Sequence, residues 1–142
     1  VVEDVALSYD EILQSCRSEL KAADPGIVEG IGGLRVPLAE GKEVVDLAAD
    51  LGLPTLVVAR SGLGTLNHSS LTVKALERRG LDVCGVVIND YAGETLAERT
   101  NPDVLESMVD LPVYTVPGLD LDTPDEAVTA VKENLPPSVL PE

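Results

Sequence analysis

The feature that most constrains the fold is an alternation of short apolar runs with longer amphipathic stretches along the whole chain. The short runs are predicted strands, over residues 26–29, 55–59, 82–88 and 112–116. The longer stretches between them place apolar residues on one helical face. Because the connections are too short for antiparallel folding back, this alternation predicts an α/β fold, with a parallel sheet covered by helices on both faces and right-handed crossovers.

Start and stop residues mark the predicted helices, which cover residues 8–22, 43–51, 68–79 and 101–109, with a last one after Thr123. Ser8 and Glu11 have the spacing of a capping box, and Thr123 has the same role in the last helix, which ends at Pro136. Pro102 is predicted to be the first residue of its helix, a position where proline is favoured.

Composition fits one globular domain with an aliphatic core. The chain has 142 residues, of which 44% are hydrophobic and only 2% aromatic, so valine, leucine and alanine must fill the interior. There is neither an apolar run of membrane-spanning length nor a basic-then-apolar N-terminus in this sequence. We therefore predict a cytoplasmic protein that makes no membrane contact.

The chain is strongly acidic, with 25 acidic and 10 basic residues and a net charge of −15. A nucleic-acid-binding protein normally has a basic surface, which this strongly acidic composition does not predict, so no nucleic-acid partner is predicted. The acidic residues are scattered, which is unlike a disordered acidic tail. We interpret them as a halophilic surface, since salt screens the self-repulsion; an acidic protein of an ordinary cytoplasm is the alternative.

Cysteine and histidine usage offers little catalytic chemistry. Cys16 falls in a predicted helix and Cys84 in a predicted strand, without C-x-x-C spacing, which indicates buried free thiols in a reducing compartment. His68 is the single histidine, so a zinc site or a Ser-His-Asp triad has little support.

The most informative loop is G-L-G-T-L-N at residues 62–67, which joins a predicted strand to a predicted helix. A glycine-rich turn at a helix N-terminus leaves backbone N–H groups unpaired at the positive end of the helix dipole. Such a turn can bind a phosphate or a carboxylate. An ordinary strand–helix loop with glycines for tight geometry is the alternative.

Other unusual residues follow the remaining predicted strands, at the sheet edge where ligands bind in open α/β folds. Glu29 precedes a glycine-rich segment, and a carboxylate there could bind Mg²⁺ near phosphates; a solvated acid is the alternative. Asn89 and Asp90 end another strand, and the Asn89 amide could pair with an adenine edge; a turn residue is the alternative. Pro117, Gly118 and Leu119 follow the last predicted strand.

Three segments, in this order and spacing, resemble dethiobiotin synthetases. They are E-G-I-G-G-L-R-V-P-L at 29–38, G-L-G-T-L-N-H-S-S-L-T at 62–72 and V-V-I-N-D at 86–90. The likeness runs from the helix after Ser8 to Leu119 and implies a P-loop NTPase-like fold. It also implies an ATP-dependent cyclo-ligase of biotin biosynthesis that carboxylates 7,8-diaminononanoate with CO₂ and closes the ring to dethiobiotin. ATP and Mg²⁺ would be required, and the enzyme would be a homodimer.

The resemblance also implies roles for particular residues, none of them catalytic. Glu29 would be the Mg²⁺ ligand. The nucleotide would contact Glu29, Gly30, Ile31, Gly32, Asn89, Asp90, Pro117, Gly118, Leu119 and Asp125. The carboxylate tail of 7,8-diaminononanoate would bind, across the dimer interface, to Leu63, Gly64, Thr65, Leu66 and Asn67.

The chain departs from this family because no segment matches the P-loop pattern G-x-x-x-x-G-K-[ST], and the first glycine-rich segment runs into Arg35 instead. We therefore expect residues 1–142 to be the C-terminal part of a single dethiobiotin synthetase-like domain that lacks its first strand and P-loop. Such a piece should expose apolar sheet edge and face and should not hydrolyse ATP by itself. A non-catalytic ligand-sensing or dimerisation module and a cobyrinate diamide synthase-like synthetase are the alternatives.

Overall fold

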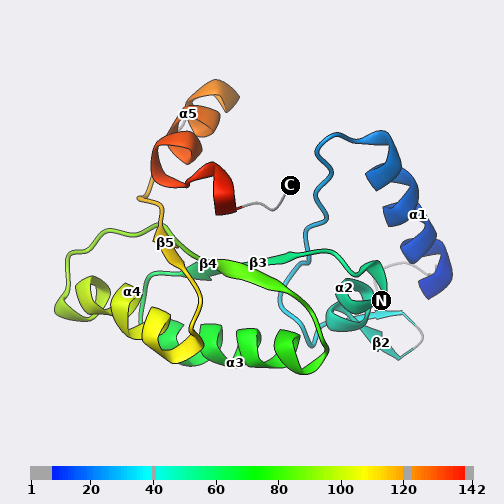
Figure 1. The fold of residues 1–142 in the computed structure, drawn as a ribbon, viewed down its shortest axis with the longest axis horizontal. Coiled ribbons are helices and arrows are strands. Elements are labelled where there is room, and N and C mark those ends of the chain that lie inside the picture. Colours follow the sequence, from blue (N-terminus) through cyan, green and yellow to red (C-terminus); the bar gives the residue numbers. More distant parts are fainter. Residues whose placement is uncertain (1–7, 40, 120–122, 140–142) are drawn as a thin grey trace, which may run out of the picture. The chain divides into compact units, whose positions relative to one another are not determined.

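The computed structural model describes residues 8–39, 41–119 and 123–139. The chain divides into two compact units, Val1–Leu53 and Pro54–Glu142, called unit 1 and unit 2 below. Figure 1 shows the elements of both units, and each unit is described by itself.

Unit 1 contains two helices and a short hairpin. The helices are α1 (Tyr9–Ala22) and α2 (Val44–Leu51), and the antiparallel strands are β1 (Pro37–Ala39) and β2 (Lys42–Glu43). At the start of α2 the Glu43 N–H donates to Asp46 Oδ2 at 2.8 Å, within a capping box. Gly52 ends α2 in the left-handed conformation, as predicted for a helix stop.

Two predictions for unit 1 were wrong, namely the strand at residues 26–29 and the side-chain cap at Ser8, and one hairpin was missed. Residues 26–29 form no strand among the described residues, and Ile27 in this run is 78% exposed, so no neighbouring strand covers it. The strands of the hairpin were not predicted because they are only three and two residues long. In α1, whose bounds match the prediction, the Ser8 side chain makes no capping hydrogen bond.

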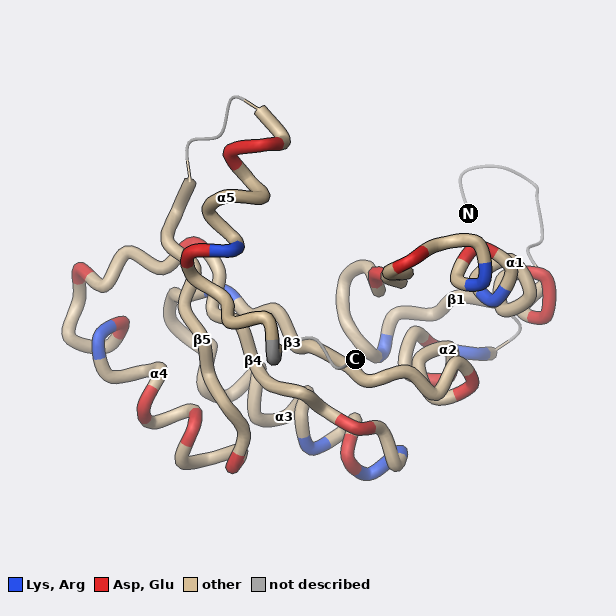
Figure 2. Tube along the Cα trace, turned by 45° about the horizontal axis from the view of Figure 1, so that its top comes forward, with Lys and Arg blue, Asp and Glu red and all other residues tan. Residues whose placement is uncertain are grey.

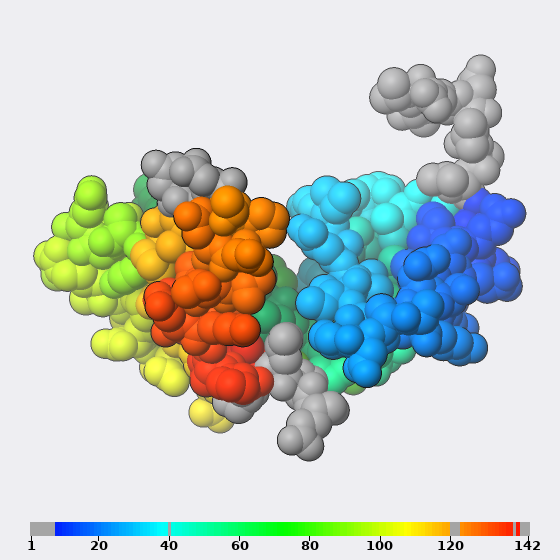
Figure 3. All heavy atoms as spheres, turned by 90° about the horizontal axis from the view of Figure 1, so that it is seen from above, coloured from blue at the N-terminus to red at the C-terminus, as the bar shows by residue number. Residues whose placement is uncertain are grey.

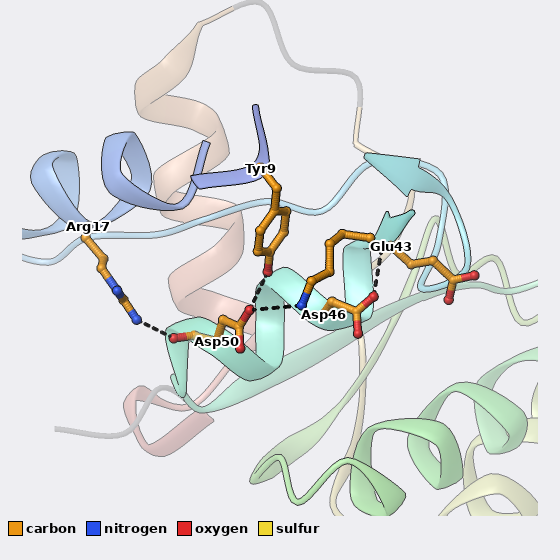
Figure 4. Close-up of polar contacts among 6 residues, drawn as sticks. Tyr9, Arg17, Glu43, Asp46 and Asp50 are labelled. Carbon is orange, nitrogen blue, oxygen red and sulfur yellow. Dashed lines mark hydrogen bonds and ion pairs between the residues drawn. The ribbon is translucent and has the colours of Figure 1, made fainter. Parts of the chain in front are cut away.

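Polar contacts join α1 to α2 (Figure 4). The buried Tyr9 hydroxyl donates to Asp50 Oδ2 at 2.7 Å, and Arg17 Nη2 donates to the Asp50 carbonyl at 2.8 Å. Lys42 Nζ lies 3.8 Å from Asp50 Oδ2 and 4.9 Å from the Tyr9 ring centroid. Burial and then the hydrogen bond to Asp50 raise the pKa of Tyr9 far above its usual value. The contact between the two helices therefore depends on a protonated tyrosine hydroxyl.

Unit 2 is built on a parallel sheet with the order β3–β4–β5, formed by Thr55–Arg60, Val83–Asn89 and Val113–Thr115. Helix α3 (Thr65–Arg78) packs against β3 and β4, and α4 (Leu96–Val109) packs against β5 and α3. Helix α5 (Pro124–Asn134) and the 3₁₀ helix η1 (Pro137–Val139) lie on the opposite side of the sheet (Figures 1 and 3). The predicted parallel sheet with helices on both faces is confirmed.

The core of unit 2 is aliphatic, as the composition requires. Its most deeply buried apolar side chains are Val73, Leu76, Val86, Ile88 and Leu105. Strand β3 is different, since Val57 is buried but Val58 is 67% exposed. Within the described residues β3 pairs with β4 alone, so it forms one edge of the sheet. Val58 is thus an exposed apolar side chain on an edge strand, while the exposure of a larger apolar sheet edge and face stays a prediction.

Two helices of unit 2 begin earlier than predicted. Helix α3 starts at Thr65 instead of residue 68, with Gly64 as its N-cap. Helix α4 starts at Leu96 because Thr95 and Glu98 form a capping box, in which the Glu98 N–H donates to Thr95 Oγ1 at 3.2 Å. Pro102 therefore lies inside α4, where it has no N–H to donate to the carbonyl four residues earlier.

Acidic residues are spread along the helices and loops of both units (Figure 2). None of the helices in the described ranges is both long and apolar enough to span a membrane. The last helix agrees with its predicted start, because the Thr123 side chain caps α5 by accepting a hydrogen bond from the Glu126 N–H.

Candidate functional site

The candidate site in unit 2 is the edge of the sheet where its parallel strands end. Arg60 of β3 lies opposite Asn89 of β4, and Ile88 of β4 lies opposite Thr115 of β5, so all strands end at one level. The segments at this edge are residues 61–67, 89–90 and 116–119, which include the first residues of α3 and the last residue of β4, and we call them together the carboxyl edge. They contain the predicted substrate residues and nearly all predicted adenine residues.

Hydrogen bonds hold the loops of the carboxyl edge together. Ser61 Oγ donates to the Asp90 carbonyl at 2.8 Å, which joins the loop after β3 to the end of β4. The Val116 N–H donates to the Ile88 carbonyl, and the Tyr91 N–H donates to the Val116 carbonyl, both at 2.9 Å. The pairing of β4 with the chain after β5 thus continues beyond the strands, and the predicted adenine residues are adjacent.

Asp90 and Gly118 are in close contact at this edge. A Cβ atom on Gly118 would lie 2.5 Å from Asp90 Oδ1, so a side chain there would displace the Asp90 carboxylate. Asp90 has a φ of 54°, in the left-handed region that aspartate tolerates better than most residues. Asn89, Asp90, Pro117, Gly118 and Leu119 are all exposed, and therefore available to a ligand.

The turn before α3 has the geometry predicted for an anion site. Gly64 has a φ of 93°, a conformation that favours glycine, and it directly precedes the helix. The Thr65 N–H donates to the Gly62 carbonyl at 3.2 Å, and the His68 N–H donates to the Gly64 carbonyl at 3.0 Å. Within the described ranges the N–H groups of Leu66 and Asn67 have no acceptor, so the helix N-terminus retains donors for a ligand.

The side chains of this turn differ in accessibility. Thr65 is 2% exposed, and its Oγ1 lies 3.4 Å from Ser69 Oγ, so its hydroxyl anchors the turn inside unit 2. Leu63 is 94% exposed, and Asn67 is also exposed. Leu66 is half-buried. The outward groups of the turn are therefore the Leu63 and Asn67 side chains and the unpaired amides.

Arg60 is a residue of this site that the sequence did not reveal. It is the last residue of β3, and its Nη2 donates to the Leu63 carbonyl at 3.2 Å. The same nitrogen lies 3.7 Å from the position that a Cβ on Gly64 would take. A guanidinium is thus beside the anion turn. The available signal was a basic residue two positions before Gly62 in a chain with few basic residues.

The predicted phosphate and metal residues Glu29, Gly30, Ile31 and Gly32 belong to unit 1. All four are exposed, and Glu29 does not end a strand, contrary to the prediction. A Cβ on Gly30 would lie 2.9 Å from Val44 Cγ1, so this segment passes close to the start of α2. The phosphate-binding role of the segment stays a prediction.

The described residues contain no group of three or more His, Cys, Asp or Glu side chains that could hold a metal ion. Glu29 is an exposed single carboxylate. Mg²⁺ in phosphate-transfer sites uses one or two carboxylates and completes its shell with water and phosphate oxygens, so one carboxylate fits that chemistry as a single ligand.

Asp125 is the second residue of α5 and is exposed. Its carbonyl accepts a hydrogen bond from Thr129 Oγ1 at 2.9 Å within the helix. This contact leaves the Asp125 carboxylate at the surface of the helix. Its predicted nucleotide role remains a prediction.

Residues 2–125 match the model of an AAA domain family, and the chain belongs to that family. Together with the parallel sheet, this match confirms the predicted α/β, P-loop NTPase-like fold class.

The relatives of the chain agree with the resemblance to dethiobiotin synthetases. It is 56% identical over 135 residues to the ATP-dependent dethiobiotin synthetase BioD of Haloferax mediterranei, and the match covers 95% of this chain and 58% of that protein. It is 35% identical over 133 residues to the same-named protein of Aquifex aeolicus, covering 93% of this chain and 57% of that protein. The chain therefore spans less than two thirds of the length of these relatives.

Proposed function

We propose that the protein takes part in the ATP-dependent conversion of 7,8-diaminononanoate and CO₂ to dethiobiotin, in the cytoplasm, as a step of biotin biosynthesis. The observation that supports this most is the 56% identity, over 95% of the chain, to a protein named ATP-dependent dethiobiotin synthetase. The carboxyl edge of unit 2 adds support, because it combines the residues proposed for both ligands.

The nucleotide base would bind at Asn89, Asp90, Pro117, Gly118 and Leu119. Supporting this, the Asn89 amide has both a donor and an acceptor for an adenine edge. The contact of Asp90 with Gly118 shapes the same place. Asp125 would extend this site from α5, and Glu29 to Gly32 would border the phosphates.

The carboxylate tail of 7,8-diaminononanoate would bind at Leu63, Gly64, Thr65, Leu66 and Asn67. Supporting this, the Leu66 and Asn67 amides are unpaired among the described residues, at the positive end of α3. A homodimer is part of the proposal. The exposed Leu63 and Leu71, at 94% and 59%, are large apolar side chains near this turn that a second protomer would cover.

In the proposed reaction CO₂ forms a carbamate on one substrate amine, ATP phosphorylates it, and the second amine closes the ring. The contribution of these residues is positioning, since a substrate fixed at its carboxylate presents its amines at a defined distance from the sheet. Mg²⁺, with Glu29 as one ligand, would supply charge neutralisation at the phosphates.

A second candidate function is a non-catalytic ligand-sensing or dimerisation module that uses the carboxyl edge to bind its ligand.

Labelled bicarbonate separates the two candidates. The protein from its whole reading frame is incubated with 7,8-diaminononanoate, Mg²⁺ and labelled bicarbonate, with or without ATP. Label in dethiobiotin only when ATP is present supports the enzyme. Binding of 7,8-diaminononanoate without turnover supports the module, and absence of both binding and turnover contradicts the proposal.

A variant pair connects this assay to the site. Asn67→Ala removes an exposed side chain of the anion turn and should weaken binding of 7,8-diaminononanoate. Asn101→Ala, on α4, is the matched control and should leave binding unchanged. Equal binding by both variants would contradict the assignment of the turn.

A further inference from the structure

We propose that Arg60 is a further substrate-binding residue, whose guanidinium recognises the carboxylate of 7,8-diaminononanoate beside the amides of Leu66 and Asn67. This inference rests on the proposed function and deepens it. Nothing in the sequence motifs assigns a role to Arg60, which precedes the G-L-G-T-L-N segment.

The position of Arg60 follows from the sheet. It is the last residue of β3, and the parallel register places it opposite Asn89 at the carboxyl edge. Its Nη2 donates to the Leu63 carbonyl at 3.2 Å, which brings the guanidinium over the turn that precedes α3. The arginine side chain therefore lies against the turn that precedes α3.

The surroundings of Gly64 are tight, and the guanidinium is part of them. A Cβ on Gly64 would lie 3.7 Å from Arg60 Nη2 and 3.2 Å from the Cε1 atom of His68. The guanidinium therefore lies close to the residue that directly precedes α3. A carboxylate bound at the start of α3 would have a cation beside it.

The charge of Arg60 is not neutralised by an ion pair within the described ranges. Elsewhere in these ranges Arg35 pairs with Glu43 at 3.0 Å and Lys42 with Asp50 at 3.8 Å, but Arg60 makes no such pair. The guanidinium has five N–H donors, and its bond to Leu63 uses one of them, so the others suit an anionic ligand.

A purely structural arginine would only brace the turn, and Arg99 provides that comparison. Arg99 Nη1 donates to the carbonyls of Gly93 and Glu94 at 3.2 and 2.7 Å, so it also holds a loop through backbone contacts. Among the described residues, Arg99 differs from Arg60 because no helix N-terminus with unpaired backbone amides directly follows it. Arg60→Gln and Arg99→Gln are therefore matched variants, of which only the first should affect carboxylate recognition.

The experiment measures binding by calorimetry to the protein expressed from its whole reading frame. Two ligands are used, 7,8-diaminononanoate and its carboxamide, which has the same diamine and chain but no negative charge. For the acid, Arg60→Gln should weaken binding about tenfold, the loss typical of one charge-assisted hydrogen bond. For the carboxamide, the same variant should cause no change. Arg60→Lys should retain part of the preference for the acid, and Arg99→Gln should retain all of it.

The outcomes are distinguishable. Equal weakening of both ligands by Arg60→Gln would show that Arg60 only shapes the turn, and unchanged binding of the acid would show that it is not in contact. Either result overturns the inference while the proposed function stands. If the unmodified protein does not bind the acid, the proposed function fails first and the inference falls with it.

Discussion

Unit 1 and unit 2 each contain a glycine-rich segment that the sequence predicts to bind a ligand, but only the segment in unit 2 belongs to a connected site. In unit 2 the turn at residues 62–67 is joined to Asp90 through Ser61, and the chain around Asp90 pairs with Val116. In unit 1 the segment after Glu29 is an exposed loop that follows no strand among the described residues.

The difference between the two glycine-rich segments shows that a sequence pattern predicts a site well when it follows a strand that has a partner in the sheet. Residues that follow adjacent parallel strands lie at the same edge, so the order β3–β4–β5 brings together residues far apart in the sequence. Residues 26–29 have the apolar composition of a strand but no partner among the described residues. The following predictions test whether the site depends on unit 2 in this way.

The largest expected effect is on the stability of unit 2. Leu105 on α4 is fully buried, so Leu105→Ala should lower the free energy of unfolding by about 2–5 kcal/mol, measured by urea denaturation. Its neighbour Val104 is 40% exposed, and Val104→Ala is the control, with a change below about 0.5 kcal/mol. Similar losses for both variants would contradict the described packing of α4.

The next effect concerns the adenine side of the carboxyl edge. Gly118→Ala places a methyl group where the Asp90 carboxylate lies, so nucleotide affinity should fall about tenfold, measured by fluorescence titration with an ATP analogue. Gly62→Ala is the control, because a Cβ there would meet no atom within 4 Å. Unchanged nucleotide affinity in Gly118→Ala would separate Gly118 from the nucleotide site.

A smaller effect is expected in unit 1. Tyr9→Phe removes the hydrogen bond to Asp50 and should cost about 1 kcal/mol of unfolding free energy at neutral pH. Because folding raises the pKa of Tyr9, this stabilisation is present below the unfolded pKa of about 10 and is lost as the pH rises above it. Denaturation at about pH 8 and about pH 11 should therefore show a larger stability difference between the Tyr9→Phe variant and the unmodified protein at the lower pH.

At neutral pH 7,8-diaminononanoate should bind the Tyr9→Phe variant as well as it binds the unmodified protein. A loss of affinity for 7,8-diaminononanoate in Tyr9→Phe would contradict the assignment of its carboxylate site to unit 2.

The smallest difference between the units is expected in how KCl changes their free energies of unfolding. Unit 1 has 11 acidic and four basic residues, and unit 2 has 14 and six, so both carry a similar net negative charge. Rising KCl should stabilise both units by screening this repulsion. Urea denaturation between about 0.1 and about 3 M KCl, followed at Tyr9 and at the tyrosines of unit 2, measures it. Stability that does not change with KCl would contradict the halophilic interpretation.

Much of the fold was predictable from local signals. Short apolar runs predicted the strands β3, β4 and β5, and the capping box at Thr123 predicted the start of α5. The errors arose where two local signals compete. Pro102 suggested a helix start, but the capping box of Thr95 and Glu98 begins α4 earlier. Gly64 acts as the N-cap of α3, so Thr65 to Asn67 lie in the helix and not in the loop.

The sequence predicted the site residues whose place follows from the end of a strand. It did not predict a residue whose role depends on the direction of its side chain. Asn89, Asp90 and Gly118 were predicted together because each follows a strand. Arg60 was not, because only the structure shows that its side chain turns toward Leu63. A pattern of residue types cannot give that direction.

The central claim is that the carboxyl edge of unit 2 holds a carboxylate at the start of α3 and a nucleotide base beside Asp90. Backbone amide NMR of the ¹⁵N-labelled protein, titrated separately with 7,8-diaminononanoate and ATP, tests it most directly. We predict that the diaminononanoate shifts the amides of residues 64–67 most and that ATP shifts those of residues 89–90 and 118–119. Largest shifts outside these residues for both ligands, with the amides of Leu66 and Asn67 unchanged, would contradict it.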